Sequence, residues 1–347
     1  MDVNEMSGKE LPASVSVTAT ARLHMGFLDM NGGLGRRFGS IGLSLEAPAI
    51  RLTASRADGF AATGPGSVRA VACAERFASR AGIAGGAHLA LEEIIPEHAG
   101  LGSGTQMALA VGVALTNLYG LPLSYGEMAA MTGRGARSGI GIGAFAQGGL
   151  LVDGGRGEHT RVPPVIARTD FPDHWRILLV FDRAELGVHG TQELDAFRML
   201  PTFPAETAAD ICRRTLMQAL PAIAERDLVA FGKAIHAIQC HVGDHFAAAQ
   251  GGGRYTSPAV GAVLDWLMAK GVGCVGQSSW GPTGFAVLGD ELEAQRMMRM
   301  LKARYGQQVN LGFMLCKARN QPGEVRVNYA KGIADAVRAA NQIDSVN

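Results

Sequence analysis

A glycine-rich stretch that runs into an apolar helical pattern places the strongest constraint on this chain. The sequence reads PEHAGLGSGTQMALA from Pro96 to Ala110, and apolar residues then recur at helical spacing as far as Leu118. The first N–H groups of a helix lack partners and the helix dipole makes this end positive, so the loop favours phosphate oxygens. A tight strand-to-helix turn that needs glycine for close packing explains the same letters equally well.

Composition and charge exclude several classes of protein. The chain has 347 residues, which fits about two domains, with 47% hydrophobic residues, 18% charged residues and a net charge of +1. This ordinary globular profile does not favour a nucleic-acid partner. Five scattered cysteines without a CxxC spacing indicate free thiols, and hence a cytoplasmic protein without a disulfide framework or thiolate zinc site. Residues 1–12 do not resemble a targeting signal, and no apolar run is long enough to span a membrane.

The N-terminal half predicts strands and helices around the glycine loop. Alternating and β-rich patterns predict strands over 14–20 and 40–55, paired as an antiparallel hairpin. A helix over 68–81 and a strand over 87–95 precede the loop, and a helix follows it. Ser124 and Glu127 form the capping box of a further helix that ends near Gly133. A second glycine-rich segment then leads into a strand over 149–153.

The C-terminal half predicts a second alternation of helices and strands. A surface connection over 162–175 precedes a buried strand over 176–182, and long helices follow over 205–220 and 221–248, with another beginning at Pro258. Strand, glycine loop, strand, helix and strand then occupy residues 271–317. The pattern predicts an α+β protein with domains over residues 14–182 and 183–347.

Three motifs, in order along the chain, resemble the GHMP kinase superfamily. PEHAGLGSGT is similar to its phosphate-binding pattern Pro-x-x-x-Gly-Leu-Gly-Ser-Ser, ATARLHMGFLD to its N-terminal substrate-side motif, and GVGCVGQSSWGPTGFAV to its C-terminal glycine-rich motif. The resemblance implies a GHMP-kinase-like two-domain fold, with an N-terminal ribosomal-protein-like β/α domain and a C-terminal ferredoxin-like α/β sandwich. It also implies a phosphate or pyrophosphate site formed by His98, Gly100, Gly102, Ser103, Gly104, Thr105 and Gln106.

Two positions depart from the kinase pattern. Superfamily kinases with a catalytic carboxylate resemble Ser-Gly-Ile-Asp, whereas here Ser138 begins a Ser-Gly-Ile-Gly sequence in which Gly141 replaces the acid. Gly104 also occupies the place of a second serine that helps to hold the metal ion. Both losses argue against ordinary phosphoryl transfer, although some superfamily kinases work without that aspartate.

A non-kinase branch of the superfamily is resembled more closely. RLHMGFLDMNG, GRRFGSIGLSLE, HAGLGSGTQMALAVG and GRGARSGIGIGAFAQGGLLVDGG are together similar to the β-ribofuranosylaminobenzene 5'-phosphate synthase family, over nearly the entire chain. The resemblance implies a pentosyltransferase that joins phosphoribosyl pyrophosphate to 4-aminobenzoate or 4-hydroxybenzoate and releases pyrophosphate and CO₂, in an early step toward tetrahydromethanopterin-type cofactors. It also implies Mg²⁺ bound with the pyrophosphate and a homodimer, without indicating metal ligands.

The residues expected to act on the substrate begin with Arg22, His24 and Asp29. On a strand, Arg22 and His24 share a face and can project together into a cleft. An exposed ion-pair partner and an interior histidine are the alternative interpretation of that pair, and the family resemblance favours a site. Arg36 and Arg37, beside glycines, suit a sugar 5'-phosphate or a benzoate carboxylate, or else a solvated turn.

Further candidates for substrate binding lie in the two later glycine-rich segments. Arg134, Arg137 and Ser138 precede the second segment and can face the phosphates. The last glycine loop offers hydroxyl and amide groups that can close over the substrate, namely Gln277, Ser278, Ser279 and Thr283. Ordinary turn chemistry explains each of these residues as well.

Two rival interpretations remain open at this point. One is a small-molecule kinase that uses ATP through the same loop, and the other is a non-catalytic anion-binding module. The segment HAIQCHVGDH pairs His236 with Cys240 and His241 with His245 at helical spacing, but on adjoining faces and without an HExxH arrangement. We therefore expect an ordinary helix there, with His241 and Asp244 as weak site candidates.

Overall fold

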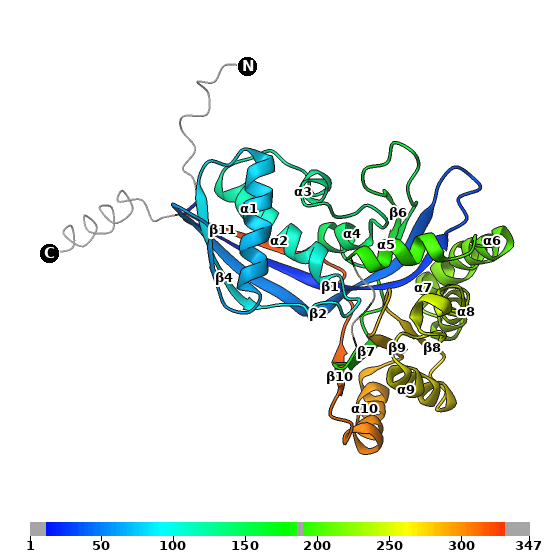
Figure 1. Cartoon of the computed structure of the whole chain (residues 1–347). Helices are drawn as coiled ribbons and strands as arrows, with labels where there is room; N and C mark the ends of the chain where they lie inside the picture. The colour runs from blue at the N-terminus through cyan, green and yellow to red at the C-terminus, as the bar shows by residue number, and fades with distance from the viewer. Residues whose placement is uncertain (1–11, 186, 188–189, 330–347) are drawn as a thin grey trace.

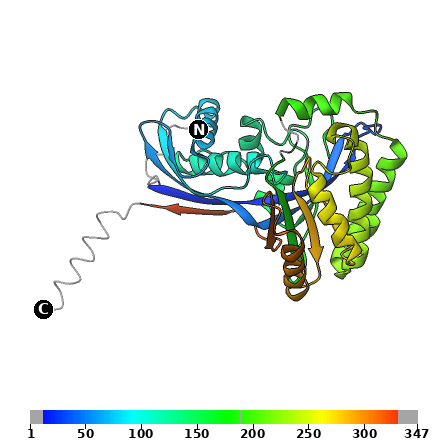
Figure 2. The same ribbon diagram turned by 60° about the horizontal axis from the view of Figure 1, so that its bottom comes forward.

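The N-terminal hairpin organises the first of two sheets in the computed structural model, which describes residues 12–185, 187 and 190–329. The long strands β1 (Ser14–Asp29) and β2 (Phe38–Ala57) pair antiparallel, which confirms the predicted hairpin. The other described strands of this sheet are β11 (Glu324–Asn328), β4 (Gly86–Glu93), β3 (Ala61–Thr63), β5 (Leu150–Asp153) and β6 (Val165–Thr169). Their order is β11-β1-β2-β4-β3, with β5 paired to both β2 and β6. Figure 2 shows β11, in red, lying along β1.

Helices cover one face of this sheet, as Figure 1 shows. They are α1 (Ser67–Ala81), α2 (Ser103–Leu118), α3 (Tyr125–Met131) and α4 (Ile140–Ala146). The central helix α2 is apolar on nearly every side because it packs on β1 and β2 while α1, α3 and α4 surround it. Ser124 and Glu127 form the predicted capping box at the start of α3.

The second sheet has the order β10-β7-β9-β8, and its described strands are antiparallel to their neighbours. The strands are β7 (Arg176–Asp182), β8 (Cys274–Gln277), β9 (Gly284–Leu288) and β10 (Leu311–Cys316). This order along the chain, with helices after β7 and between β9 and β10, is the ferredoxin-like arrangement. The expected C-terminal α/β sandwich is therefore present.

Helices fill both faces of the second sheet. α9 (Pro258–Ala269) and α10 (Glu291–Tyr305) bury one face in an apolar cluster that includes Leu178 and Val180. The alternate residues Ile177 and Leu179 belong to the larger core that continues into the first sheet. The chain from β7 to α9 contains α5 (Gly190–Met199), α6 (Ala205–Arg214), the π-helical turn η1 (Thr215–Ala219), α7 (Leu220–Glu225), α8 (Leu228–Phe246) and the 3₁₀ turn η2 (Ala247–Gln250). Of these elements, α8 packs against both β8 of the second sheet and β1 of the first.

Several elements differ from the sequence-based expectation. The helix predicted over 221–248 is interrupted at Arg226, which adopts a left-handed conformation with φ of 58° before Asp227 caps α8. The expected surface connection over 162–175 contains β6, which extends the first sheet through β5. The second glycine-rich segment contains α4, and β11 was not predicted. None of the described helices is long and apolar enough to cross a membrane.

The two sheets do not divide at Asp182. β7, which ends at that residue, hydrogen-bonds to β9 and β10 of the second sheet, while β11 returns to the edge of β1. The chain therefore passes between the sheets twice. It enters the second sheet at β7 and returns to the first sheet at β11, the last described strand. The division into domains over 14–182 and 183–347 stays a prediction.

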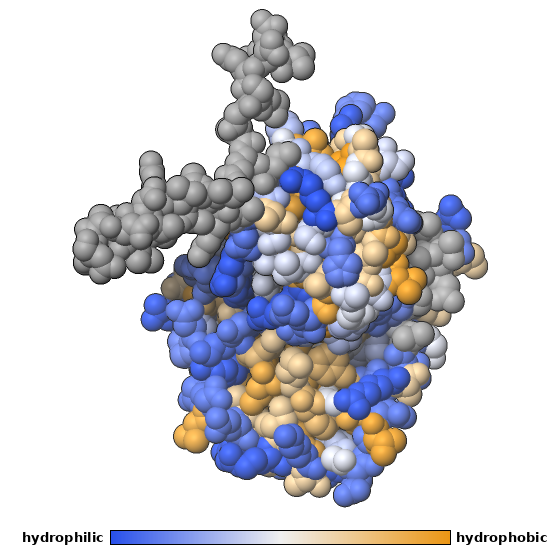
Figure 3. Space-filling model, turned by 90° about the vertical axis from the view of Figure 1, so that its left-hand side faces the viewer, coloured by the Kyte–Doolittle hydropathy of each residue, from blue (hydrophilic) through white to orange (hydrophobic). Residues whose placement is uncertain are grey.

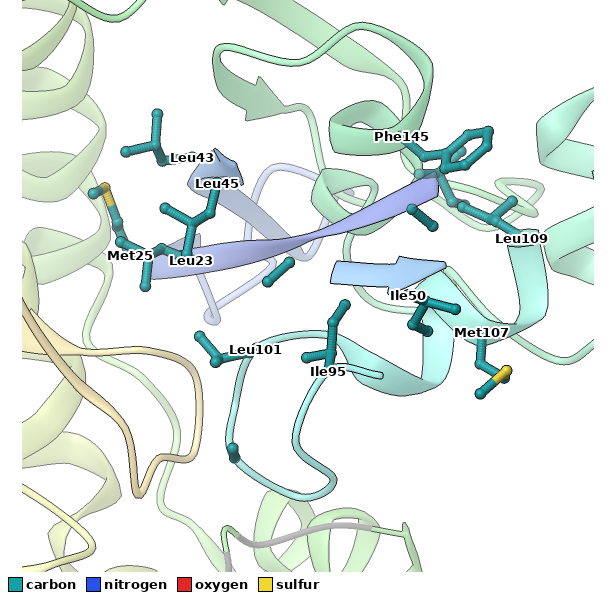
Figure 4. Close-up of a cluster of buried hydrophobic side chains, with 14 of the residues drawn as sticks. Leu23, Met25, Leu43, Leu45, Ile50, Ile95, Leu101, Met107, Leu109 and Phe145 are labelled. Carbon is teal, nitrogen blue, oxygen red and sulfur yellow. The ribbon is translucent and has the colours of Figure 1, made fainter. Parts of the chain in front are cut away.

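Leu101 anchors the glycine loop in the core beside Ile95, as Figure 4 shows, and is only 1% exposed. We expect Leu101→Ala to lower the free energy of unfolding by roughly 2–5 kcal/mol, because a buried leucine side chain is replaced by a cavity. The control Leu34→Ala removes a side chain that is 91% exposed and should change stability by less than about 0.5 kcal/mol. Denaturant unfolding measures both, and equal effects would contradict this assignment.

Candidate functional site

The loop between β4 and α2 is fixed by close contacts that only glycine allows. Gly100 and Gly102 have φ of 75° and 82°, in the left-handed region, on either side of the buried Leu101. A Cβ on Gly100 would collide with the carbonyl oxygen of Ser278, whose hydroxyl donates a 2.8 Å hydrogen bond to the Gly100 carbonyl. The loop is thus held against the last glycine-rich loop of the chain.

Arg22 and His24 reach the same loop from β1. The backbone N–H of Arg22 donates to the Leu101 carbonyl at 3.1 Å, and its guanidinium donates to the Gly100 carbonyl. That guanidinium also lies 3.2 Å from the position that a Cβ on Gly102 would occupy. The backbone N–H of His24 donates to the Ser278 hydroxyl at 3.0 Å. Strand β1 and both glycine loops are therefore joined at one point.

A cleft of about 730 Å³ opens above the N-terminus of α2. Arg22 and His24 both line it, as their period-two spacing predicts. Four arginines and two histidines contribute to the described lining, and no aspartate or glutamate does. The lining residues are Arg22, His24, Phe27, Arg69, His98, Gly100, Gly102, Ser103, Gly104, Thr105, Gly133, Arg134, Gly135, Ala136, Arg137, Ser138, Gly141, Gly187, Ser279, Trp280 and Gly281.

The two glycines that depart from the kinase pattern are each in close contact with another side chain. A Cβ on Gly104 would lie 2.9 Å from a terminal nitrogen of Arg134, so the guanidinium occupies the space that a serine would fill. A Cβ on Gly141 would lie 3.0 Å from the Thr105 methyl carbon, and Gln106 donates to the Gly141 carbonyl at 2.7 Å. An aspartate at 141 would have to displace Thr105.

His24 is held as a neutral imidazole. Burial first, and the positive charge of Arg22 second, lower the pKa of His24 to about 3. Its Nε2 lies 3.1 Å from the Ser40 hydroxyl, and the side chain edges the Phe27 ring at a centroid distance of 4.6 Å. At neutral pH the side chain can share a hydrogen bond without carrying charge.

Ser138 lines the cleft and donates to the buried Asp153, at 3.0 Å. Burial raises the pKa of Asp153, although the N–H groups of Gly155 and Gly139 and the hydroxyls of Ser138 and Ser40 act in the opposite direction. The carboxylate accepts backbone hydrogen bonds from Gly139 and Gly155, both at 2.9 Å. It therefore fixes the turn that enters α4 from behind the cleft.

Aromatic side chains form one wall of the cleft. Trp280 stacks on Phe246 at a centroid distance of 4.0 Å and a plane angle of 19°, and Phe27 lies 6.2 Å from the same ring. Arg137 lies over the Phe197 ring at 5.4 Å, and Phe197 contacts Trp280 at 5.5 Å. Phe27 and Trp280 both contribute to the cleft lining, although most of each ring is buried, so this wall of the cleft is aromatic.

Asp29, Arg36 and Arg37 lie away from this cleft, at the tip of the N-terminal hairpin. The Asp29 carboxylate accepts from the N–H groups of Asn31 and Gly32 at 2.7 and 3.0 Å, which is turn chemistry. Arg36 donates to the Gly154 and Gly155 carbonyls at 2.8 and 2.7 Å, and Arg37 to the Met30 carbonyl at 3.0 Å. These three residues brace the hairpin tip.

The remaining candidates divide between the cleft and the interior. His98, Gly100, Gly102, Ser103, Gly104, Thr105, Arg137, Ser138 and Ser279 line the cleft. Four others are buried behind it and do not line it, namely Gln106, Gln277, Ser278 and Thr283. Gln277 bonds to Gln250 at 2.8 Å and accepts from the Thr256 N–H at 2.7 Å. These interior residues shape the loops around the cleft.

The histidine-containing helix α8 shows side-chain pairing within the protein. His241 lies 3.1 Å from the Asp210 carboxylate, and Asp244 binds the Arg254 guanidinium through two contacts of 2.7 and 3.0 Å. His236 contacts Cys240 at 3.5 Å. Within the described part of the chain, no three His, Cys, Asp or Glu side chains gather as a metal site would require.

Sequence reasoning did not find Arg69, Phe27 or Trp280 as cleft residues. Arg69 lies on α1, and its position in the helical pattern does not distinguish it from an arginine on the exposed face of any helix. The sequence did contain a signal for Trp280. The other residues of the loop QSSWGPTG include Gly, Ser and Pro, which are typical of turns, whereas a large aromatic residue is not explained by turn formation. Burial and ring stacking explain it.

Comparison with known proteins agrees with this geometry. The model for the GHMP kinases N terminal domain matches residues 68–149, and the GHMP kinases C terminal model matches residues 219–307. A β-ribofuranosylphenol 5'-phosphate synthase of Archaeoglobus fulgidus is 35% identical over 325 residues, which is 88% of this chain and 98% of that protein. The chain belongs to the β-ribofuranosylphenol 5'-phosphate synthase family. The predicted membership of this non-kinase branch is confirmed.

A second protein of the same name, from Methanothermobacter thermautotrophicus, is 29% identical over 293 residues, covering 78% of this chain and 88% of its own. The fold of this β-ribofuranosylphenol 5'-phosphate synthase family member is shared with a homoserine kinase from Cytophaga hutchinsonii, with a TM-score of 0.62 at 16% identity over 94% of this chain and 100% of that chain. A mevalonate diphosphate decarboxylase from Staphylococcus aureus gives 0.63 at 15% identity, over 90% and 98%. The predicted GHMP fold is confirmed.

The depressed pKa of His24 predicts a loss of stability in acid. Below the ordinary histidine pKa of 6.5, the unfolded chain binds a proton that the folded protein does not bind until about pH 3. Stability from this group is therefore complete above pH 6.5 and falls with decreasing pH, by at most about 1.4 kcal/mol per pH unit. Unfolding of wild type and His24→Gln between pH 7 and 4 should show a shallower decline in the variant; parallel declines would refute the assignment.

The backbone of Gly102 predicts a specific loss of anion binding. Gly102→Ala introduces a side chain at a positive φ and against Arg22, so we expect weaker binding of pyrophosphate by about tenfold or more in titration calorimetry. Gly82→Ala is the matched control, because Gly82 has φ of 69° with nothing within 4 Å of the added atom. Equal weakening in both variants would mean that general destabilisation, not the loop, is responsible.

Proposed function

We propose that this protein is a decarboxylating C-ribosyltransferase that joins phosphoribosyl pyrophosphate to a 4-substituted benzoate, in an early step of tetrahydromethanopterin-type cofactor biosynthesis. The observation that carries the proposal is one cleft in which the N-terminus of a helix and a glycine loop face an aromatic wall, with no acidic side chain in its described lining. Such a cleft suits an anionic leaving group beside an aromatic acceptor. The names of the curated relatives, which specify a ribofuranosylphenol, favour 4-hydroxybenzoate as the acceptor.

The leaving pyrophosphate would bind at the start of α2. As the bond from the ribose C1 to the pyrophosphate oxygen breaks, positive charge grows on the sugar and negative charge on the departing group. The N–H groups of the loop, the Arg22 guanidinium and the hydroxyls of Ser103 and Thr105 are placed around that end of the cleft. Donors that are already oriented stabilise the developing charge without the cost of reorganising.

The acceptor ring would lie against Phe27 and Trp280. The ring carbon that carries the carboxylate forms the new bond to the ribose C1 while the bond from C1 to pyrophosphate breaks, and the 4-hydroxyl group transfers its proton to a group in the site. When CO₂ then leaves, the electron pair of its bond remains in the ring and restores aromaticity. The 4-oxygen is reprotonated from the same group. The products are the ribosylated phenol, pyrophosphate and CO₂, and no other reactant is consumed.

His24, whose ring lies 4.6 Å from that of Phe27 in the aromatic wall, would accept the proton that the 4-hydroxyl group releases. With a pKa of about 3 in the protein without substrate, it is a weak base. The positive charge of Arg22 is one cause of that low pKa, so a bound pyrophosphate that offsets Arg22 would raise the pKa and make His24 a better acceptor. Binding of the pyrophosphate would thereby make His24 ready to accept the proton of the acceptor.

We expect Mg²⁺ to reach the site bound to the pyrophosphate group of the substrate. The described cleft lining offers hydroxyl and imidazole groups but no carboxylate, so the protein's own side chains do not form the oxygen ligand set that this ion prefers. The ion would enter as a complex with the sugar pyrophosphate. Its chemistry would be partial neutralisation of the pyrophosphate charge, and no protein ligand is assigned to it.

The proposal includes a cytoplasmic location and a homodimer. The five free cysteines support the first, and the family resemblance implies the second. Figure 3 shows apolar residues gathered on the lower part of the side where β10 and α10 lie. The β10 residues Leu311–Leu315 are all partly exposed, and this strand lies at the end of the strand order of its sheet. That edge is a candidate interface between two copies.

Product analysis tests the proposed function directly. Purified protein with phosphoribosyl pyrophosphate, Mg²⁺ and carboxyl-labelled 4-hydroxybenzoate should release labelled CO₂ and pyrophosphate in a 1:1 ratio, and 4-aminobenzoate should be compared in parallel. Formation of ADP from ATP and an alcohol, without CO₂ release, would establish the kinase alternative instead. Tight binding of phosphoribosyl pyrophosphate without turnover would establish a non-catalytic anion-binding module.

A further inference from the structure

A second, smaller hollow lies beside Gly104. It has a volume of about 110 Å³ and lies between α1 and the N-terminal turns of α2. Three arginines line it, namely Arg69 and Arg76 from α1 and Arg134 from the segment after α3. Arg69, Arg134 and Gly104 also line the large cleft, so the two spaces adjoin at these residues.

The positive charge of this hollow is only partly balanced. Arg69 pairs with Glu97 at 2.9 Å. Neither Arg76 nor Arg134 has an acidic partner among the residues that the structure describes. Burial and the nearby charge of Arg69 lower the pKa of Arg134, which indicates that like charges gather here without compensation. Such an arrangement is stabilised by an anion.

We propose that this hollow binds the sugar 5'-phosphate of phosphoribosyl pyrophosphate, while the glycine loop binds the pyrophosphate; the inference rests on the proposed function. The substrate carries phosphate groups at two ends of one ribose, and each end needs its own cations. Guanidinium groups match the oxygens of a phosphomonoester in pairs. A volume of about 110 Å³ suits one phosphate group, well below the roughly 300–1,000 Å³ that encloses a whole small-molecule ligand.

The position of the aromatic wall decides which phosphate goes where. The pyrophosphate is attached to the reacting C1, which must meet the acceptor ring beside Phe27 and Trp280. The Arg22 side chain lies beside Gly102 of the loop. Arg22 is on the same strand as His24, whose ring is in contact with Phe27. Arg76, in contrast, lines the hollow and is not part of the described cleft lining. We therefore assign the pyrophosphate to the glycine loop, which contacts the strand that carries His24, and the unreactive 5'-phosphate end of the sugar to the hollow.

Titration calorimetry with ribose 5-phosphate and with pyrophosphate, each as a separate probe, tests this assignment. In Arg76→Ala we expect ribose 5-phosphate to bind at least about tenfold more weakly, since a charge-assisted contact is lost, and pyrophosphate to bind within about twofold of wild type. Arg76→Lys should retain part of the affinity. The control Arg299→Ala removes an exposed charge from α10 and should change neither titration.

The outcomes separate this inference from the proposed function. If wild type does not bind ribose 5-phosphate, or if Arg76→Ala binds it as wild type does, the hollow is not the 5'-phosphate site, and the transferase proposal stands on its own assay. Equal weakening for both probes, or weakening for pyrophosphate alone, also overturns the assignment. Selective weakening in a protein that releases no CO₂ from the labelled benzoate would preserve the anion site and reject the transferase. Because Arg76 is exposed, Arg76→Ala should unfold at the same temperature as wild type, which thermal unfolding checks.

Discussion

Close approach at the Gly100–Gly104 loop is the constraint on which the rest of the site depends. A side chain on Gly100 would meet the Ser278 carbonyl, one on Gly102 would meet Arg22, and one on Gly104 would meet Arg134. Because these positions are bare, three segments that are far apart in sequence converge on one helix terminus. The same absence of side chains leaves the N–H groups of the loop open to a ligand.

The electrostatics of the site differ from those of the whole protein. The chain is nearly neutral, with a formal charge of +1, yet four arginines and no acidic residue appear in the described cleft lining. Low-dielectric walls concentrate that local field, so an anionic substrate is attracted to the cleft even though the molecule as a whole has little net charge. The same field contributes to keeping His24 neutral.

Local sequence patterns predicted those parts of the fold that local physics determines. The hairpin β1–β2, the capping box of α3 and the helix after the glycine loop all follow from short-range rules. Helix α4 was missed because Gly141 and Gly143 lower helix propensity by roughly 1 kcal/mol each. Burial of Ile140 and Phe145 outweighs that cost, and no local pattern reveals it.

The site was predictable where a motif sets backbone geometry and not where tertiary contacts place a side chain. Arg22, His24 and the predicted loop residues other than Gln106 lie at the cleft, because strand periodicity and glycine spacing determine their positions. Arg36 and Arg37 were expected either to bind an anion or to form a solvated turn. They lie outside the cleft, where the Gly154 and Gly155 carbonyls, more than a hundred residues away, accept hydrogen bonds from Arg36, and their binding role stays a prediction. Arg69 and Arg76 matter only because α1 packs beside α2, which no local pattern specifies.

The return of β11 to β1 has a consequence for how the protein is made. Ser14 pairs with Asn328, so the first sheet cannot be completed on the ribosome until almost the whole chain has emerged. Until then, the edge of β1 carries unpaired N–H and C=O groups that another strand can bind. Pairing across such a sequence separation is slow to form, because a very long loop must close first. Nascent chains therefore have a long interval in which the edge of β1, the strand that carries Arg22 and His24 to the cleft, is open to wrong partners.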